Sequence, residues 1–228
     1  MSKQKKNANY QTDKKIADQA KKEEQKIKEK NAKTMKIAAI CAGAVLAVVA
    51  IIVGILFAVG AFDYSPEPTY HATFNIKGYD SIHIELYGND APETVKNFIT
   101  LAEEGFFDDR TFHTFVDGLL YGGSLKDDYA SYGIKGEFSS NGFENNIPMK
   151  KGVLCMARGE EYNSAYGQFF VLTKNNKDIA GDYAAFGRIT NLEVLKSILK
   201  NIEVDENGKI VESTSPRILS VTLHEAHH

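Results

Sequence analysis

Cysteine is scarce in this chain of 228 residues, which contains only Cys41 and Cys155. Cys41 lies in a long apolar run and Cys155 lies between Leu154 and Met156, so a disulfide between the two is not expected. Stability must therefore come from a hydrophobic core and not from cross-links. The sequence around Cys155 offers no histidine partner, and we expect a small core side chain there rather than a nucleophile.

Positive charge is scarce beyond residue 36. The net charge is −3, yet the first 36 residues hold twelve lysines, no arginine and five acids, which is about +7. About −10 is left for the remainder, which argues against nucleic acid as a partner because phosphate binding needs clustered Lys and Arg. Neither a GxGxxG nor a Walker pattern occurs, so Gly122-Gly123 is not a phosphate-binding loop.

Charge is missing altogether from residues 37–62, a run long enough to span a bilayer with some tilt. The lysines before it and Asp63 after it predict a cytoplasmic N-terminus and an external C-terminal part. A cleaved signal peptide is the rival, because Val59-Gly60-Ala61 resembles a cleavage site; the length of the run and of the preceding tail favour an uncleaved anchor. The Lys-rich tail, residues 1–36, is either a solvated segment or one that touches anionic lipid head groups.

A Pro-containing linker, residues 63–70, is predicted to connect this anchor to a single domain over residues 71–225, followed by a tail at 226–228. Residues 71–87 alternate as two strands around a turn at Gly78-Tyr79-Asp80, which predicts a hairpin. Further strands are predicted at the ranges 153–157, 168–173, 184–189 and 217–224.

Two helices interrupt these strands. The first is predicted to open with Asp90 as its cap and Pro92 in its first turn and to end at Gly105, with Val95, Phe98, Ile99 and Ala102 on its buried face. The second is predicted after Asn191, with Leu192, Leu195, Ile198 and Leu199 on its apolar side. Many short strands with two helices favour a mainly β domain, a closed antiparallel barrel capped at its ends.

Five motifs follow one another between residues 82 and 190: IELYGNDAPETVKNFITLAEEGFFDDRTFH, IKGEFSSNGFENN, KGVLCMAR, GQFFVLT and YAAFGRI. In this order they resemble the cyclophilin family of peptidyl-prolyl cis-trans isomerases. It implies an eight-stranded antiparallel β-barrel closed by two helices, with no cofactor and no metal. It also implies a monomer that acts on proline-containing unfolded or exported polypeptides.

The chemistry implied is rotation about an X-Pro peptide bond, over a barrier of about 18–20 kcal/mol, by preferential binding of the twisted amide. Carried over by motif, Gln168 would be a catalytic residue that hydrogen-bonds the substrate backbone, and Phe170 would form the wall of the proline pocket. The other substrate contacts would be Phe112, His113, Leu119, Leu120, Tyr121, Ala157, Ile179 and Tyr183.

The stretch from Phe112 to Gly123 departs from the family pattern FHRVIPGFMxQGGD. Thr114 stands where the family has its central catalytic Arg, Asp117 replaces the Pro, one residue is missing before the Gly pair, and Ser124 replaces the Asp. A Thr hydroxyl is a weaker donor than a guanidinium. Arg158 either reaches over the groove as a partial substitute or is a solvated rim residue.

Three functions remain open: a slow isomerase that assists folding of exported proteins, a module that binds proline-containing segments without turnover, and a membrane-tethered adaptor. His113 and Asp117 lie four residues apart, but a packed His beside the pocket is favoured over a metal site. The setting predicted from residues 1–62 is a single-pass protein of the cell membrane with its domain outside.

Overall fold

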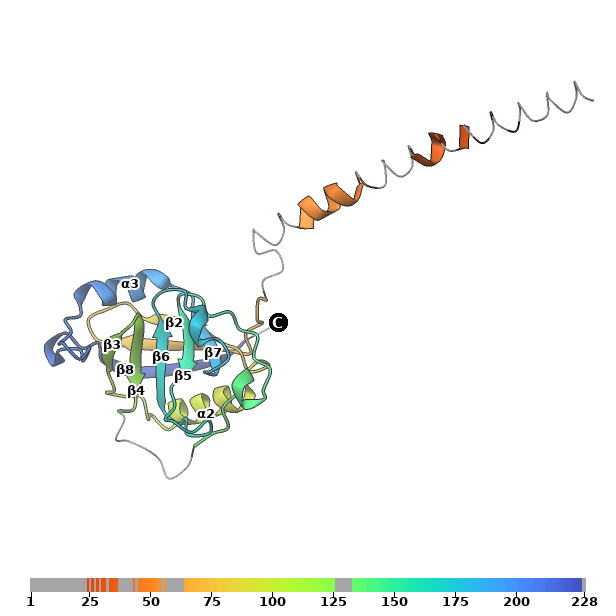
Figure 1. The fold of residues 1–228 in the computed structure, drawn as a ribbon. Helices are drawn as coiled ribbons and strands as arrows, with labels where there is room; N and C mark the ends of the chain where they lie inside the picture. Colours follow the sequence, from red (N-terminus) through yellow and green to blue (C-terminus); the bar gives the residue numbers. More distant parts are fainter. Residues whose placement is uncertain are drawn as a thin grey trace, which may run out of the picture. The chain divides into compact units, whose positions relative to one another are not determined.

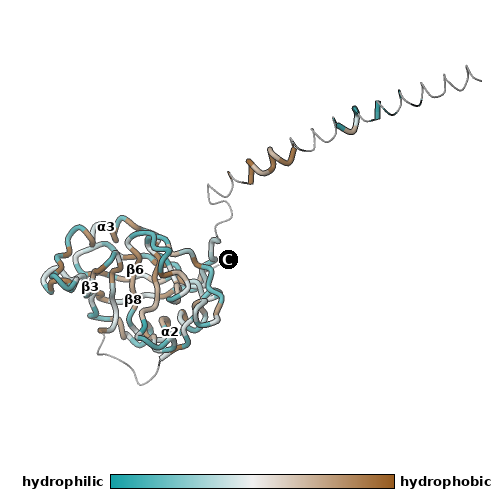
Figure 2. The backbone as a smooth tube through the Cα atoms, viewed as in Figure 1, coloured by the Kyte–Doolittle hydropathy of each residue, from teal (hydrophilic) through white to brown (hydrophobic). Residues whose placement is uncertain are grey.

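The computed structural model describes residues 64–125 and 133–226 continuously, together with separate positions between 24 and 55. The chain divides into two units, Met1–Asp63 and Tyr64–His228. In the first unit residues 45–53 are helical, and Figure 2 shows them as hydrophobic. Among the described residues, none of the helices has both the length and the apolar character that crossing a membrane requires. Much of the anchor predicted over residues 37–62, and the start of the tail, lie outside the described residues.

The second unit alternates short strands with two α-helices (Figure 1). The described elements are β1 Tyr70–Ile76, β2 Ile82–Leu86, α2 Pro92–Glu103, β3 Phe112–Val116, β4 Leu119–Gly123, β5 Val153–Met156, β6 Gln168–Leu172, β7 Ala185–Ile189, α3 Leu192–Asn201 and β8 Ile218–Glu225. The predicted hairpin is β1 and β2, which pair from Tyr70 opposite Leu86 to Phe74 opposite Ile82. The strands predicted after residue 150 are confirmed with shifts of one residue or so at their ends.

All eight strands form one antiparallel sheet in the order β3-β4-β6-β5-β7-β2-β1-β8. The sheet curls until its edge strands β3 and β8 approach each other. Backbone hydrogen bonds then join residues 109–112 to residues 216–218: Asp109 N to Ile218 O at 2.8 Å, Ile218 N to Arg110 O at 2.7 Å and Phe112 N to Pro216 O at 2.9 Å. We call this junction the seam. The predicted barrel is therefore a curled sheet whose edges are joined by a few bonds and not by a full ladder.

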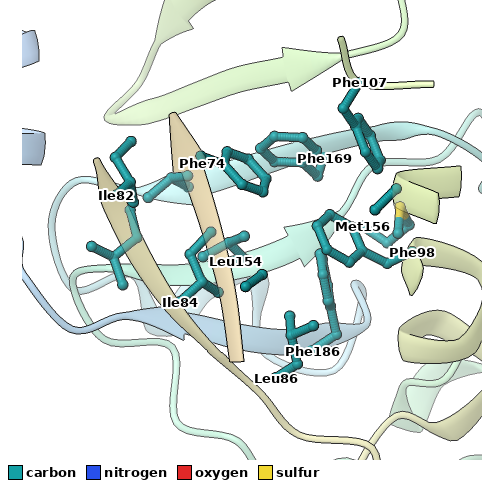
Figure 3. Packing of buried hydrophobic residues seen from close by; sticks show 14 of the residues in the cluster. Phe74, Ile82, Ile84, Leu86, Phe98, Phe107, Leu154, Met156, Phe169 and Phe186 are labelled. Atoms are coloured by element: carbon teal, nitrogen blue, oxygen red, sulfur yellow. The ribbon is translucent and has the colours of Figure 1, made fainter. Parts of the chain in front are cut away.

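Phenylalanine fills the interior of the curled sheet (Figure 3). The rings of Phe98 and Phe107 have centroids 5.0 Å apart, and those of Phe98 and Phe186 are 5.4 Å apart. Phe74 and Phe169 pack edge to face at 5.8 Å. All five side chains are fully buried, and each such burial stabilises the fold by roughly 1.5–3 kcal/mol. The expected hydrophobic core is present, and Cys155, the cysteine within the described residues, is free.

Helices α2 and α3 lie at opposite ends of the curled sheet (Figure 1). The buried face of α2 includes Val95, Phe98 and Ala102, as predicted. The prediction that Asp90 caps α2 is wrong, because the N-cap is Ala91 and Asp90 accepts a 2.6 Å hydrogen bond from Tyr64 instead. The distant Glu137, fully buried, takes over the capping role.

Glu137 receives the backbone N–H groups of Glu93 and Thr94, each at 2.9 Å, on its two carboxylate oxygens. The N-terminus of a helix leaves such donors without intrahelical partners, and a carboxylate there also meets the positive end of the helix dipole. The N-cap side chain of α3 also bonds groups outside its own helix. Asn191 precedes that helix, but its side chain bonds the backbone of Ser81 and His83 and so ties α3 to β2.

Candidate active site

β3 and β4 form a tight hairpin at one edge of the sheet. The turn consists of Asp117 and Gly118, with φ values of 53° and 84°. Positive φ at both central residues is the geometry of a two-residue hairpin whose twist matches its strands, and glycine adopts it without strain. The pairing places Thr114 opposite Tyr121 and Val116 opposite Leu119, with a register shift between Phe112 and Thr114. The stretch that departs from the family pattern is thus an ordered hairpin.

Residues of this hairpin point alternately to the two faces of the sheet. Phe112 and Leu120 are buried in the phenylalanine core, where Phe112 packs edge to face on Phe169 at 5.9 Å. Both had been predicted as substrate contacts. Their position inside the curled sheet keeps them away from any bound peptide. Leu119 and Tyr121 lie on the other, outward face.

The outward face carries a second apolar cluster, which we call the outer cluster. Its buried members are Tyr87, Ile147, Met149, Val153, Cys155, Ala157, Phe170, Leu172 and Ala185, with Leu119, Tyr121, Ile179 and Tyr183 packed against them. Burial raises the pKa of the Cys155 thiol, which lies 3.7 Å from the sulfur of Met149. Cys155 is therefore an unreactive packing residue, as expected from its sequence context.

Phe170 lies beneath two tyrosine rings of the outer cluster. Its ring centroid is 5.3 Å from that of Tyr121 and 5.1 Å from that of Tyr183, and its exposed fraction is 0%. The residue predicted to form the wall of the proline pocket therefore has no surface open to solvent. Tyr121 and Tyr183, which are half-buried, form the outer surface above it.

A groove of about 790 Å³ lies beside the outer cluster. It is lined by His113, Thr114, Val116, Tyr121, Leu125, Arg158, Gly159, Glu160, Gln168 and Lys209. Five of the predicted site residues meet here: His113, Thr114, Tyr121, Arg158 and Gln168. Five others, Leu119, Ala157, Phe170, Ile179 and Tyr183, belong to the outer cluster and not to the groove lining.

Gln168 begins β6 and pairs with Gly123 of β4. Its side-chain Nε2 donates a 3.2 Å hydrogen bond to the carbonyl of Ser124, and its backbone carbonyl accepts from Ala157 N at 2.9 Å. These bonds fix the amide side chain at the floor of the groove. A primary amide has two N–H donors and one carbonyl acceptor, so a substrate backbone still finds groups to pair with.

His113 and Thr114 bond to each other. The His113 Nδ1 and the Thr114 Oγ1 lie 2.9 Å apart, while the His113 Nε2 is buried without a hydrogen-bond partner among the described residues. Burial lowers the pKa of His113, with the Ser124 backbone acting in the opposite direction. At neutral pH the imidazole is therefore uncharged. Burial also raises the pKa of Tyr121, whose hydroxyl stays protonated.

Arg158 lines the groove, and two of the three guanidinium nitrogens donate to backbone carbonyls. Its Nε donates to the carbonyl of Asp182 at 3.0 Å, and its Nη1 donates to Gly159 at 3.0 Å and to Glu160 at 3.3 Å. Three aromatic rings, those of Phe138, Tyr162 and Tyr183, surround it at 5.0–5.2 Å. Arg158 thus cross-links the loops around the groove through its Nε and Nη1 groups.

Lys209 is a groove residue that the sequence did not indicate. The turn at residues 205–208 folds back onto β3, so that Lys209 forms an isolated bridge with Thr114. Asn207-Gly208 marks a turn in the sequence, but nothing local specifies which strand a turn about 95 residues away will contact. Among the described residues no cluster of three or more His, Cys, Asp or Glu side chains is placed to hold a metal ion.

The fold agrees with the comparison to protein families. The sequence model described as cyclophilin type peptidyl-prolyl cis-trans isomerase/CLD matches residues 71–223. The chain belongs to the cyclophilin-type peptidyl-prolyl cis-trans isomerase family, and its class of activity is that of an isomerase.

Individual relatives support this assignment. The chain is 34% identical over 162 residues to peptidyl-prolyl cis-trans isomerase B of Escherichia coli, covering 64% of this chain and 96% of that protein. It is 31% identical over 133 residues to a peptidyl-prolyl cis-trans isomerase of Helicobacter pylori, covering 58% and 79%. Among solved structures, a cyclophilin-type isomerase of Cryptosporidium parvum matches with a TM-score of 0.60 at 22% identity, over 68% of this chain and 99% of that chain. The structural match shows the shared fold.

Proposed function

We propose that this protein isomerises X-Pro peptide bonds in the groove beside β3 and β4. The observation that carries the proposal is the meeting of His113, Tyr121 and Gln168 in one groove next to the outer cluster. X-Pro bonds interconvert slowly, in about tens to hundreds of seconds, and both isomers are populated. Catalysis needs no bond cleavage and no cofactor, because binding the twisted amide better than the planar one is sufficient.

Each part of the groove has a defined task in this proposal. Gln168 pairs with the backbone of the peptide on the N-terminal side of the proline. The proline ring packs on the exposed face of Tyr121, since Phe170 beneath it is covered. Tyr121 thus takes the place of Phe170 as the surface on which the proline ring packs. A relative with the same fold, from Cryptosporidium parvum, was crystallised in the presence of the dipeptide Ala-Pro, which supports peptide binding by this fold.

Turnover is proposed to be slow. The position at which the family carries its Arg is Thr114, and the Thr114 hydroxyl is bonded to His113. Loss of one preorganised donor typically costs about 10²–10³ in rate. The alternative is a module that binds proline-containing segments without turnover, and the covered Phe170 together with the occupied Arg158 is what favours it.

The setting proposed for this activity is the outer face of a cell membrane. The uncharged run at residues 37–62, with lysines before it, supports an uncleaved anchor with the N-terminus inside. A domain held there would meet newly exported chains whose X-Pro bonds are still a mixture of cis and trans isomers. Exported, unfolded polypeptides are therefore the proposed substrates, with a tethered adaptor as the outcome if no peptide binds.

A protease-coupled assay with the full chain and an Ala-Pro-Phe peptide tests the enzyme. We expect a rate above the uncatalysed one that increases linearly with protein concentration. A rate equal to the uncatalysed one at micromolar protein would reject isomerisation. Titration of the chain with the same peptide, followed by amide chemical shifts, then separates binding without turnover from a purely structural role.

A further inference from the structure

Twisting an X-Pro bond changes the charge at its nitrogen. Conjugation with the carbonyl is lost, so the nitrogen regains a lone pair that a positively charged N–H donor can stabilise. Of the described residues that line the groove, two carry a permanent positive charge, Arg158 and Lys209. His113 is uncharged at neutral pH because burial lowers its pKa. One of these two cations is therefore the candidate for the catalytic donor.

Arg158 is poorly suited to this task because its Nε and Nη1 donors are in use and its guanidinium is enclosed. Backbone carbonyls of Asp182, Gly159 and Glu160 accept from it, and three rings enclose the guanidinium. Moving the guanidinium further into the groove would require breaking these contacts. The cost would fall on the loops that shape the groove.

Lys209 lies on a turn that packs against β3, and its backbone is held there. Its bridge with Thr114 is flanked by hydrogen bonds from Phe115 N to Gly208 O at 2.7 Å and from Ile210 N to His113 O at 2.8 Å. A Cβ on Gly208 would lie 2.8 Å from the carbonyl of Phe115, so the turn and β3 are in close contact. Directly opposed residues of an antiparallel pair project to the same face. The Lys209 side chain therefore leaves the backbone next to that of Thr114.

The ammonium group of Lys209 is available for a substrate. Lys209 is exposed, and within ranges 64–125 and 133–226 its side chain forms no ion pair and no hydrogen bond. The turn that carries it is braced independently, since Asp205 Oδ1 accepts from the backbone N–H groups of Asn207 and Lys209, both at 2.9 Å. An anchored stem thus presents an unoccupied cation to the groove.

We propose that Lys209 is the cationic catalytic donor of this isomerase and takes the place that Thr114 leaves without a charge. The inference rests on the proposed isomerase function. It also accounts for the small residue at 114, because a guanidinium on β3 would lie beside the Lys209 ammonium and the two charges would repel. The short threonine leaves that space to the lysine stem.

The protease-coupled assay on the full chain tests the role of Lys209. Lys209→Gln and Lys209→Met should each lower kcat by roughly tenfold or more, as expected for a lost transition-state donor, with KM changed less than about twofold. Lys209→Arg keeps the charge and the donors and should retain most of the activity. Lys200→Gln, an exposed lysine on α3, is the matched control and should equal the wild type.

The double variant Thr114→Arg with Lys209→Gln provides an independent readout, because a charge restored from β3 should recover activity that a merely structural loss would not. If the wild type exceeds the uncatalysed rate and Lys209→Gln is as active as the wild type, this inference is overturned and the proposed function stays intact. A wild type no faster than the uncatalysed reaction would overturn both. Equal thermal melting of the variants ensures that the comparison concerns the site alone.

Discussion

The ring of Tyr121 lies 5.3 Å from the ring of Phe170 and, together with Tyr183, leaves Phe170 without exposed surface. The two residues are direct partners in the β4–β6 pairing, so their side chains share the outward face of the sheet. In this chain the surface offered to a proline ring is a tyrosine face.

Replacing Tyr121 by Ala should therefore weaken peptide binding by about tenfold, since the loss of an aromatic contact is worth roughly 0.5–1.5 kcal/mol beyond its area. Titration of the full chain with an Ala-Pro peptide measures the change. Tyr121→Phe keeps the ring and should bind as the wild type does. Tighter binding by Tyr121→Ala would mean that the substrate contacts Phe170 instead.

Phe170 should matter more for stability than for direct contact. Phe170→Ala removes a fully buried ring from the outer cluster and should lower the free energy of unfolding by about 3–5 kcal/mol. Denaturant unfolding of the full chain gives this value. Leu219→Ala is a suitable control, because Leu219 is 50% exposed and should cost little. A small loss for Phe170→Ala would show that the cluster closes over the gap.

The buried carboxylate at the start of α2 gives a third expectation. Glu137→Ala removes both acceptors of the Glu93 and Thr94 N–H groups and should destabilise the fold by about 2 kcal/mol or more. Glu137→Gln retains one carbonyl acceptor and should cost less. Equal unfolding free energies for wild type and Glu137→Ala would contradict the capping role.

His113 predicts a dependence of stability on pH. Its pKa is lowered on folding from the ordinary value of 6.5, so the unfolded chain binds a proton more readily than the folded one. Stability is then greatest above pH 6.5 and falls as the pH drops below it. The unfolding free energy measured between pH 8 and pH 5, both chosen to bracket roughly the ordinary histidine pKa, should fall more steeply for wild type than for His113→Gln. Parallel curves would show that His113 contributes nothing.

Protease accessibility tests the proposed orientation of the chain in the membrane. With an epitope tag at the C-terminus and the full chain expressed in a bacterium, protease added outside spheroplasts should remove the tag, while the Lys-rich tail stays protected. A chain lacking residues 37–62 is the control and should be protected at both ends. Release of a shortened, soluble domain into the medium would favour the signal-peptide alternative.

The sequence predicted the fold well because its signals were local and redundant. Alternation in residues 71–87 and the spacing of Val95, Phe98 and Ala102 specify a hairpin and a helix face without reference to distant contacts. The cap at Asp90 failed because a residue more than 40 positions away, Glu137, bonds the helix more directly. Capping by a distant side chain leaves no trace in the local pattern.

The site was less predictable for the same reason. Motif order located Gln168 and His113 in the groove, but it also assigned Phe112 and Leu120, which face the core. Phe112 and Leu120 lie on the inner face of the sheet, and motif order alone does not say which face a strand residue takes. Lys209 was missed because its position depends on how a remote turn packs against β3.

The seam has a consequence for how this molecule loses activity. A short 3-10 helix at Glu212–Thr214 connects the turn that carries Lys209 to β8, and the bonds that close the seam hold β8 near β3. Edge pairings with few bonds open at lower free energy than the centre of a sheet. Warming should therefore loosen the seam, and with it the chain segment that carries Lys209, while the phenylalanine core is still intact. The protein would then lose its activity at temperatures below global unfolding, and the activity would return on cooling without refolding.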